Sequence, residues 1–139
     1  MKASFVLDSS VAMAWCFRDE ATTATSRLLD RMGTEAAAIP GWWYLEITNV
    51  LAVAERRKLL GPAQVAEFIA LIETFDLELD DQAPRRAFTH LLPLCRGHGL
   101  SSYDAAYLDL ALRRQLPLAS LDGDLRAAAT AVGVDLLGR

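Results

Sequence analysis

Acidic side chains lie on the apolar faces of two segments that have helical periodicity. Glu46 shares one stripe with Trp43 and Ile47, and Asp104 shares another with Tyr107. An isolated ionised carboxylate inside a protein either takes up a proton or finds a positive partner. Two inward-facing acids therefore predict a shared cation.

Two further acids follow short apolar segments that are typical of buried strands. Asp8 follows Ser4–Leu7, and Asp122 follows Leu118–Leu121. Because the sites of parallel α/β sheets gather beyond the carboxyl ends of the strands, both carboxylates are expected at that edge of a sheet. We expect them to converge there with the two helical acids.

Three of the four acids also have a local structural interpretation. Asp8 and Asp122 can serve as helix N-caps, and Asp122 with the glycine after it can form a turn. Asp104 completes the Ser101-x-x-Asp104 spacing of a capping box. Glu46 lies within its segment and has no such alternative.

The donor set of these four acids consists of oxygen alone. Without cysteine or histidine at ligand spacing, it favours Mg²⁺ or Mn²⁺ over zinc. An ion held in this way polarises a phosphodiester and activates water, so the expected chemistry is phosphoryl transfer. The net charge of −4 and the pI near 5.1 argue against binding of nucleic acid through a broad basic surface. A bound metal would instead meet the phosphate locally.

The composition indicates one globular domain over residues 1–139, with 53% hydrophobic residues and neither a repeat nor a linker. No charge-free stretch approaches the roughly 20 residues of a membrane helix, and Asp8 interrupts the run that a signal peptide needs. Cys16 and Cys95 lie far apart without a paired motif, which favours reduced core thiols. We expect a cytoplasmic protein.

Short apolar runs alternate with longer helical periodicities along the chain. The expected strands are Ser4–Leu7, Ala36–Ile39, Phe75–Leu79, Leu118–Leu121 and Val134–Leu136. The expected helices are Ser9–Phe17, Thr22–Met32, Trp42–Arg57, Pro62–Thr74, Pro84–Arg96, Ser102–Gln115 and Asp124–Val132. This alternation predicts an α/β fold, with a mostly parallel sheet covered by helices on both faces.

The third expected strand carries a dense acidic run. Asp76, Glu78 and Asp80 alternate with apolar residues, which is typical of an edge strand with one wet face. We therefore interpret the run as structural rather than catalytic. The arginine pairs near helix ends are expected to be solvated, as is the pair of Asp109 with Arg113.

Four ordered motifs carry a family resemblance. They are FVLDSS at residues 5–10, LEITNVL at 45–51, LSSYDAAY at 100–107 and LASLDGDL at 118–125. Together, and in this order, they resemble the PIN-domain nucleases and among them the VapC-type toxin ribonucleases of bacterial toxin–antitoxin pairs. The resemblance covers essentially the whole chain.

The resemblance implies a three-layer α/β/α PIN fold with a five-stranded parallel sheet. It also implies a Mg²⁺- or Mn²⁺-dependent endoribonuclease that hydrolyses RNA such as tRNA or rRNA, acts as a homodimer and is inhibited by a cognate antitoxin. The matching catalytic and metal-binding residues are Asp8, Glu46, Asp104 and Asp122, and the possible additional ones are Asp124, Ser9, Ser120 and Asn49. In this comparison Asn49 is expected to orient Glu46, one helical turn away.

Other functions stay open at the level of sequence. A protein with this fold can act as a binding module whose acids are caps. His90 and His98 can be an acid–base pair for metal-free RNA cleavage. Asp8 also suits an aspartyl-phosphate phosphatase, although Ser10 stands where such enzymes usually have a second acid.

An aromatic tip, Pro40-Gly41-Trp42-Trp43-Tyr44, is open to two uses. It can stack bases or receive a segment of an antitoxin, while core packing is favoured for Trp43. We expect the antitoxin to dock a helix or extended segment into an apolar groove, with a basic side chain reaching the carboxylates.

Overall fold

The computed structural model describes residues 2–139. Its strands are β1 (Ala3–Leu7), β2 (Ala36–Pro40), β3 (Asp76–Asp80), β4 (Leu118–Ala119) and β5 (Leu136–Leu137). Its α-helices are α1 (Ser9–Cys16), α2 (Thr23–Arg31), α3 (Trp43–Arg56), α4 (Pro62–Ile72), α5 (Ala83–Arg86), α6 (Leu92–His98), α7 (Ser102–Arg114) and α8 (Gly123–Ala131). A 3₁₀ turn, Arg18–Glu20, precedes α2, and a π-helical stretch, Ala87–Leu91, joins α5 to α6.

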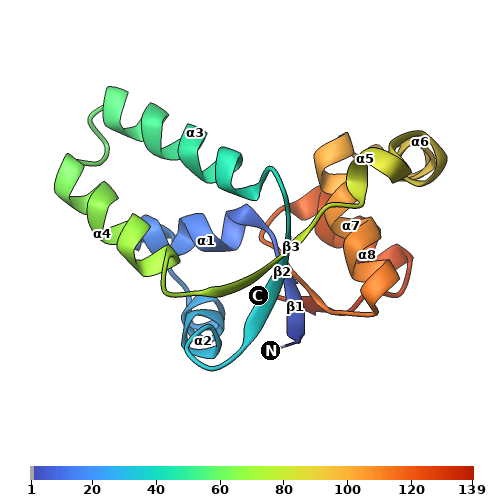
Figure 1. Ribbon diagram of the computed structural model, residues 1–139, viewed down its shortest axis with the longest axis horizontal. Coiled ribbons are helices and arrows are strands. Elements are labelled where there is room, and N and C mark those ends of the chain that lie inside the picture. The colour runs from blue at the N-terminus through green and yellow to red at the C-terminus, as the bar shows by residue number, and fades with distance from the viewer. Residues whose placement is uncertain (1) are drawn as a thin grey trace.

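The five strands form one sheet in the order β3-β2-β1-β4-β5, and every neighbouring pair is parallel. Helices α1–α4 cover one face and α5–α8 cover the other, as Figure 1 shows. The predicted three-layer α/β fold is therefore confirmed. After β1 the chain winds toward β3, and after β4 it winds toward β5, so the direction reverses between β1 and β4. Ligands bind at such a reversal point in open α/β sheets.

Buried strands and the helices packed on them form the core. Strand β2 is buried throughout, as expected for a strand that has neighbours on both edges and helices on both faces. The ring of Trp43, which begins α3, has no exposed surface, so its predicted core packing is confirmed. Cys16 and Cys95 are free and partly buried.

The predicted helix Pro84–Arg96 is divided into α5, the π-helical stretch and α6. Pro93, just inside α6, has no N–H to continue the helical ladder, which accounts for an irregular turn before it. Gly99 then ends α6 with φ of 65°, a conformation that glycine adopts without strain. This sharp stop allows α7 to begin three residues later.

Strand β3 lies at an edge of the sheet, as predicted, but only part of its acidic face is solvated, since Asp76 is exposed while Glu78 and Asp80 are partly buried. Arg114 on α7 pairs with Glu78 at 3.0 Å, and Arg113 pairs with Asp80 at 2.9 Å. The prediction of a wet face holds for Asp76 but not for Glu78 and Asp80, because arginines from α7, more than 30 residues away in sequence, cover these two acids. The run stabilises the edge strand, in agreement with its structural interpretation.

The expected solvated pair of Asp109 with Arg113 is also corrected. Asp109 is only 4% exposed, and its Oδ2 accepts hydrogen bonds from Arg86 at 2.7 Å and from Arg113 at 3.0 Å. Burial raises the pKa of Asp109, but the two guanidinium groups hold it below its usual value. Helical periodicity placed Asp109 on the outer face of α7, which the segment containing Arg86 covers.

No helix between Lys2 and Arg139 combines the length and apolar composition that crossing a bilayer requires.

Candidate active site

Four elements bring their acidic residues to the carboxyl-terminal edge of the sheet. Asp8 directly follows β1, and Asp122 lies three residues after β4. Helix α3 follows β2 and carries Glu46 in its first turn. Helix α7 runs back toward the start of β4, so its first turn, with Asp104, lies at the same edge.

Asp8 is buried, with 5% of its surface exposed, and it is held by two hydroxyl groups. Its Oδ2 accepts hydrogen bonds from Ser10 Oγ at 2.7 Å and from Ser120 Oγ at 2.8 Å. Burial raises the pKa of Asp8, and these hydrogen bonds partly offset the rise. Asp8 occupies the N-cap position of α1 but makes no capping hydrogen bond. A capping role therefore does not explain why an acidic residue stands at this buried position.

Glu46 is half-buried and is held by a residue that sequence reasoning did not select. Tyr107 on α7 donates its hydroxyl hydrogen to Glu46 Oε1 at 2.6 Å. Burial raises the pKa of Glu46, as does the negative charge of Asp8, while the hydrogen bonds from Tyr107 and Ser9 lower it. Asn49, the predicted orienting residue, is exposed. Glu46 is thus held by Tyr107 rather than by Asn49.

The pKa of Asp104 is raised by burial and by the negative charges of the other acids. Its pKa is raised to about 6, first by burial and then by the charges of Asp122, Asp8, Glu46 and Asp124. Charges shift a pKa in this way only when they are near in space, so the other carboxylates lie within electrostatic range of Asp104. Its own side chain does not cap α7, because the cap is the hydroxyl of Ser101, which accepts from the Asp104 N–H at 3.1 Å.

The segment after β4 contributes one capping acid and one exposed acid. Asp122 Oδ2 accepts from the N–H of Leu125 at 2.8 Å, so this acid does cap α8. Ser120, which is fully buried, accepts from the N–H of Asp122 at 3.0 Å while donating to Asp8. Asp124 is exposed in the first turn of α8. Ser120 therefore links the two strand ends on which the site is built.

The chemistry of this donor set fits a hard divalent cation. In the part of the chain that the structure describes, none of the four acids pairs with an arginine, lysine or histidine. No basic side chain among the described residues therefore offsets the negative charges of these acids. A bound Mg²⁺ or Mn²⁺ would neutralise such charges. Over residues 2–139, no three acidic, histidine or cysteine side chains are arranged closely enough to hold one metal ion as they stand.

The two histidines do not face each other. His90 lies in the π-helical stretch and His98 at the end of α6, eight residues further on. At about 1.5 Å per helical residue, they are separated by roughly 12 Å along the axis. This separation argues against the acid–base pair considered from the sequence.

The aromatic tip divides among three environments. Trp43 is buried, Tyr44 is 46% exposed, and Trp42 makes an edge-to-face contact with Tyr103 at a ring-centroid distance of 5.8 Å. Tyr103 is 59% exposed and directly precedes Asp104. The contact of Trp42 with Tyr103 therefore joins the first turns of the two helices that carry Glu46 and Asp104.

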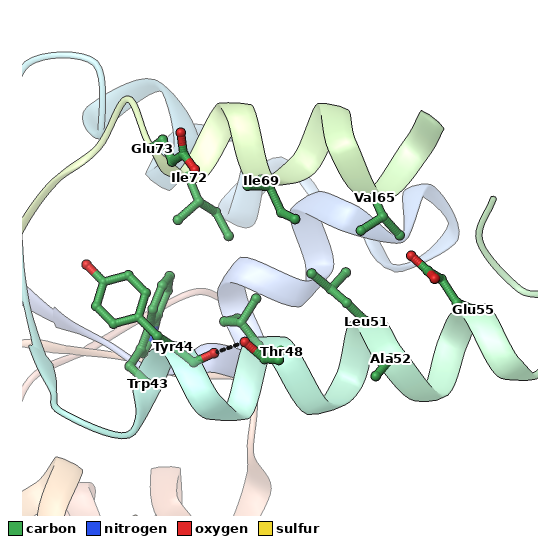
Figure 2. A pocket seen from close by; sticks show the side chains of 11 residues that line it. Trp43, Tyr44, Thr48, Leu51, Ala52, Glu55, Val65, Ile69, Ile72 and Glu73 are labelled. Atoms are coloured by element: carbon green, nitrogen blue, oxygen red, sulfur yellow. Dashed lines mark hydrogen bonds between the residues drawn. The ribbon is translucent and has the colours of Figure 1, made fainter. Parts of the chain in front are cut away.

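A separate apolar groove of about 450 Å³ runs between α3 and α4. Figure 2 shows side chains of both helices lining it, with Leu51 on α3 facing Val65 and Ile69 on α4. Glu55 and Glu73 lie toward its opposite ends. The groove is thus apolar along its length and acidic at both ends.

Comparison with known proteins gives a family for this geometry. The sequence matches the PIN domain over residues 5–131. The chain belongs to the PIN-domain family. The match spans all four acids of the candidate site, and it confirms the family resemblance. No curated protein matches the sequence.

Three solved structures have a similar fold to this PIN domain. PAE2754 from Pyrobaculum aerophilum superposes with a TM-score of 0.65 and 19% identity, covering 98% of this chain and 92% of that one. FitAcB from Neisseria gonorrhoeae superposes with a TM-score of 0.64 and 17% identity, and the match covers 95% of each chain. A toxin–antitoxin complex from Klebsiella pneumoniae superposes with a TM-score of 0.56 and 16% identity. The match covers 86% of this chain and 87% of that one. At these identities the likeness is one of fold.

Proposed function

We propose that this PIN-domain protein is a divalent-metal-dependent endoribonuclease and the toxin of a toxin–antitoxin pair, similar to the VapC-type toxins. The observation that carries the proposal is the placement of the four acids at the carboxyl-terminal edge of the sheet, two of them after β1 and β4 and two in the first turns of α3 and α7. The pKa of Asp104, raised to about 6, agrees with this placement. Structural acids usually pair with bases, as Asp109 does in this chain. Unpaired acids gathered at the reversal point of the sheet instead suit a metal-dependent site.

Asp8, Glu46, Asp104 and Asp122 would hold Mg²⁺ or Mn²⁺. Such an ion, when bound, polarises the phosphodiester of RNA, activates water and neutralises charge on the leaving oxygen. The side chains around the four acids keep them in place. Among these positioning groups, Ser10 and Ser120 orient Asp8, while Tyr107 and Ser9 act on Glu46.

The proposed substrate is RNA, whose phosphate the bound cation would meet. The net charge of −4 requires the phosphate to be met locally by the cation rather than by a basic surface. Asp124 is proposed to add a further carboxylate at the rim of the site, and the support is that its charge contributes to the raised pKa of Asp104. Both tRNA and rRNA are proposed substrates.

An antitoxin is the proposed protein partner, and the groove between α3 and α4 is its proposed docking site. The support is the similar fold of a protein in the Klebsiella toxin–antitoxin complex and the apolar lining of the groove. Glu55 and Glu73 at its ends favour a partner helix with basic residues. Copurification with the product of a neighbouring gene tests this partner. The proposed homodimer is tested by light scattering of the purified chain.

RNA cleavage by the purified protein tests the enzymatic proposal. Total tRNA and a structured rRNA fragment are incubated with protein and Mg²⁺ or Mn²⁺, then again with excess EDTA. Asp8→Asn serves as the inactive variant, and Asp19→Asn, on the 3₁₀ turn away from the acids, serves as the matched control. Discrete cuts that need both metal and Asp8 are expected. Cuts that persist in EDTA or in Asp8→Asn would refute the mechanism, and Mn²⁺ binding without any cleavage would favour the binding-module alternative.

A further inference from the structure

Tyr107 lies at the meeting point of three of the elements that build the candidate site. Its side chain is fully buried on α7, yet its hydroxyl contacts two other helices. The hydroxyl donates to Glu46 Oε1 on α3 at 2.6 Å, across 61 residues of sequence. It also accepts from the backbone N–H of Ser9, the first residue of α1, at 3.4 Å.

The two contacts together fix the direction of the hydroxyl proton. A backbone N–H can only donate, so the Tyr107 oxygen is the acceptor toward Ser9. The single hydroxyl hydrogen is then left for Glu46, whose carboxylate accepts it. Asp8 makes no side-chain cap on α1, so Tyr107 supplies a partner for one of the N–H groups that open this helix.

We propose that Tyr107 is a positioning residue that fixes the carboxylate of Glu46 for cation binding. This inference rests on the proposed metal-dependent function. Tyr107 holds Oε1 and leaves Oε2 outside this hydrogen bond, on a side chain close enough to Asp104 and Asp8 for the charges to interact. A free glutamate side chain has three rotatable bonds, and ordering them on binding a cation would cost conformational entropy. Tyr107 orders Glu46 in advance.

The hydroxyl, rather than the ring, is the functional part of Tyr107. The ring is packed in the core, where phenylalanine has nearly the same shape. A purely structural role would be served by the ring, together with the contact to Ser9. The short, charge-assisted hydrogen bond to Glu46 instead connects the buried residue to the acids.

The test is the affinity for Mn²⁺ alone, measured by calorimetry without RNA on the wild type, Tyr107→Phe, Glu46→Ala and the double variant. Mutating a residue that hydrogen-bonds to a metal-binding side chain typically lowers the metal affinity by about 10–100-fold. Tyr107→Phe is therefore expected to weaken Mn²⁺ binding at least about tenfold. In the Glu46→Ala background the same substitution is expected to add no further loss, because Tyr107 acts through Glu46. Tyr103→Phe, on the exposed face of the same helix, is the matched control and is expected to bind as the wild type does.

Each outcome separates this inference from the proposed function. Wild-type affinity in Tyr107→Phe, or an equal loss with and without Glu46, overturns the positioning role and leaves the metal-dependent function standing. A wild type that binds no Mn²⁺ overturns both. Should Tyr107→Phe fail to fold, Glu46→Asp draws the carboxylate one methylene back from the hydroxyl. That variant is expected to lose at least about tenfold in affinity, and unchanged binding would overturn the role.

Discussion

Neutralising Asp104 is expected to stabilise the protein when no metal is present. The raised pKa of about 6, against an ordinary 3.8, means that folding brings this carboxylate into an environment that opposes its charge. At about 1.36 kcal/mol per pKa unit, the difference corresponds to about 3 kcal/mol. Because Asp104 keeps contact with water, screening reduces the expected effect to about 1–2 kcal/mol. Asp104→Asn should therefore raise the free energy of unfolding by this amount at pH 7.

The sign of the pH dependence follows from the direction of the shift. A carboxyl whose pKa is higher in the folded than in the unfolded protein favours folding below its unfolded pKa of 3.8. That contribution is lost as the pH rises through about 6. Asp104→Asn removes the titrating carboxyl group. The free energy of unfolding of the variant should therefore exceed that of the wild type by more at pH 7 than at pH 4.

Urea denaturation and thermal melting in EDTA measure this difference at both pH values. For a chain of 139 residues, the gain at pH 7 corresponds to a rise of roughly 3–8 °C in Tm. Added Mn²⁺ should reverse the order, because it stabilises the wild type by binding to its folded form. A variant that is no more stable than the wild type at pH 7, or equally stabilised at pH 4, would refute the convergence of the acids around Asp104.

Four further substitutions test the ion pairs, the site and the core. Asp109→Asn leaves two arginines without their buried carboxylate and should lower the free energy of unfolding by about 2–4 kcal/mol in urea. Glu35→Gln, in a pair more exposed than that of Asp109, should change it much less, and equal effects would contradict the importance of burial. Ser120→Ala removes a donor to Asp8 and should weaken Mn²⁺ binding about tenfold in calorimetry, whereas unchanged affinity would exclude this orienting role. Leu118→Ala should cost about 2–5 kcal/mol in the same denaturation assay, and a smaller loss would show that the core refills the cavity.

The layers of the fold could be predicted because each element carries its own pattern. Strand β1 was recognised from an uninterrupted apolar run, and β3 was placed at an edge from its alternating charges. The contacts that cover these elements could not be predicted in the same way. Arg86 reaches Asp109 from the last residue of α5, and the helical periodicity of α7 carries no information about such a neighbour.

Glu46 and Asp104 were selected for the candidate site because each acid breaks an apolar pattern, and their role as ligands stays a prediction. Besides burial, the charge of Glu46 raises the pKa of Asp104, which places the two carboxylates within electrostatic range of each other. Tyr107 was missed because a tyrosine on an apolar stripe looks like ordinary core packing. One signal was available, since Tyr107 lies one helical turn from Asp104 and a buried hydroxyl needs a partner.

Locating a bound ion tests the central claim most directly. Anomalous diffraction from a crystal grown with Mn²⁺ shows where the ion lies, independently of any RNA substrate. The expected result is one or two ions coordinated by carboxylate oxygens of the four acids, with Tyr107 still bonded to Glu46. Crystals with no ion at these carboxylates, or with Mn²⁺ only elsewhere on the surface, would contradict a metal-dependent site at the ends of β1 and β4.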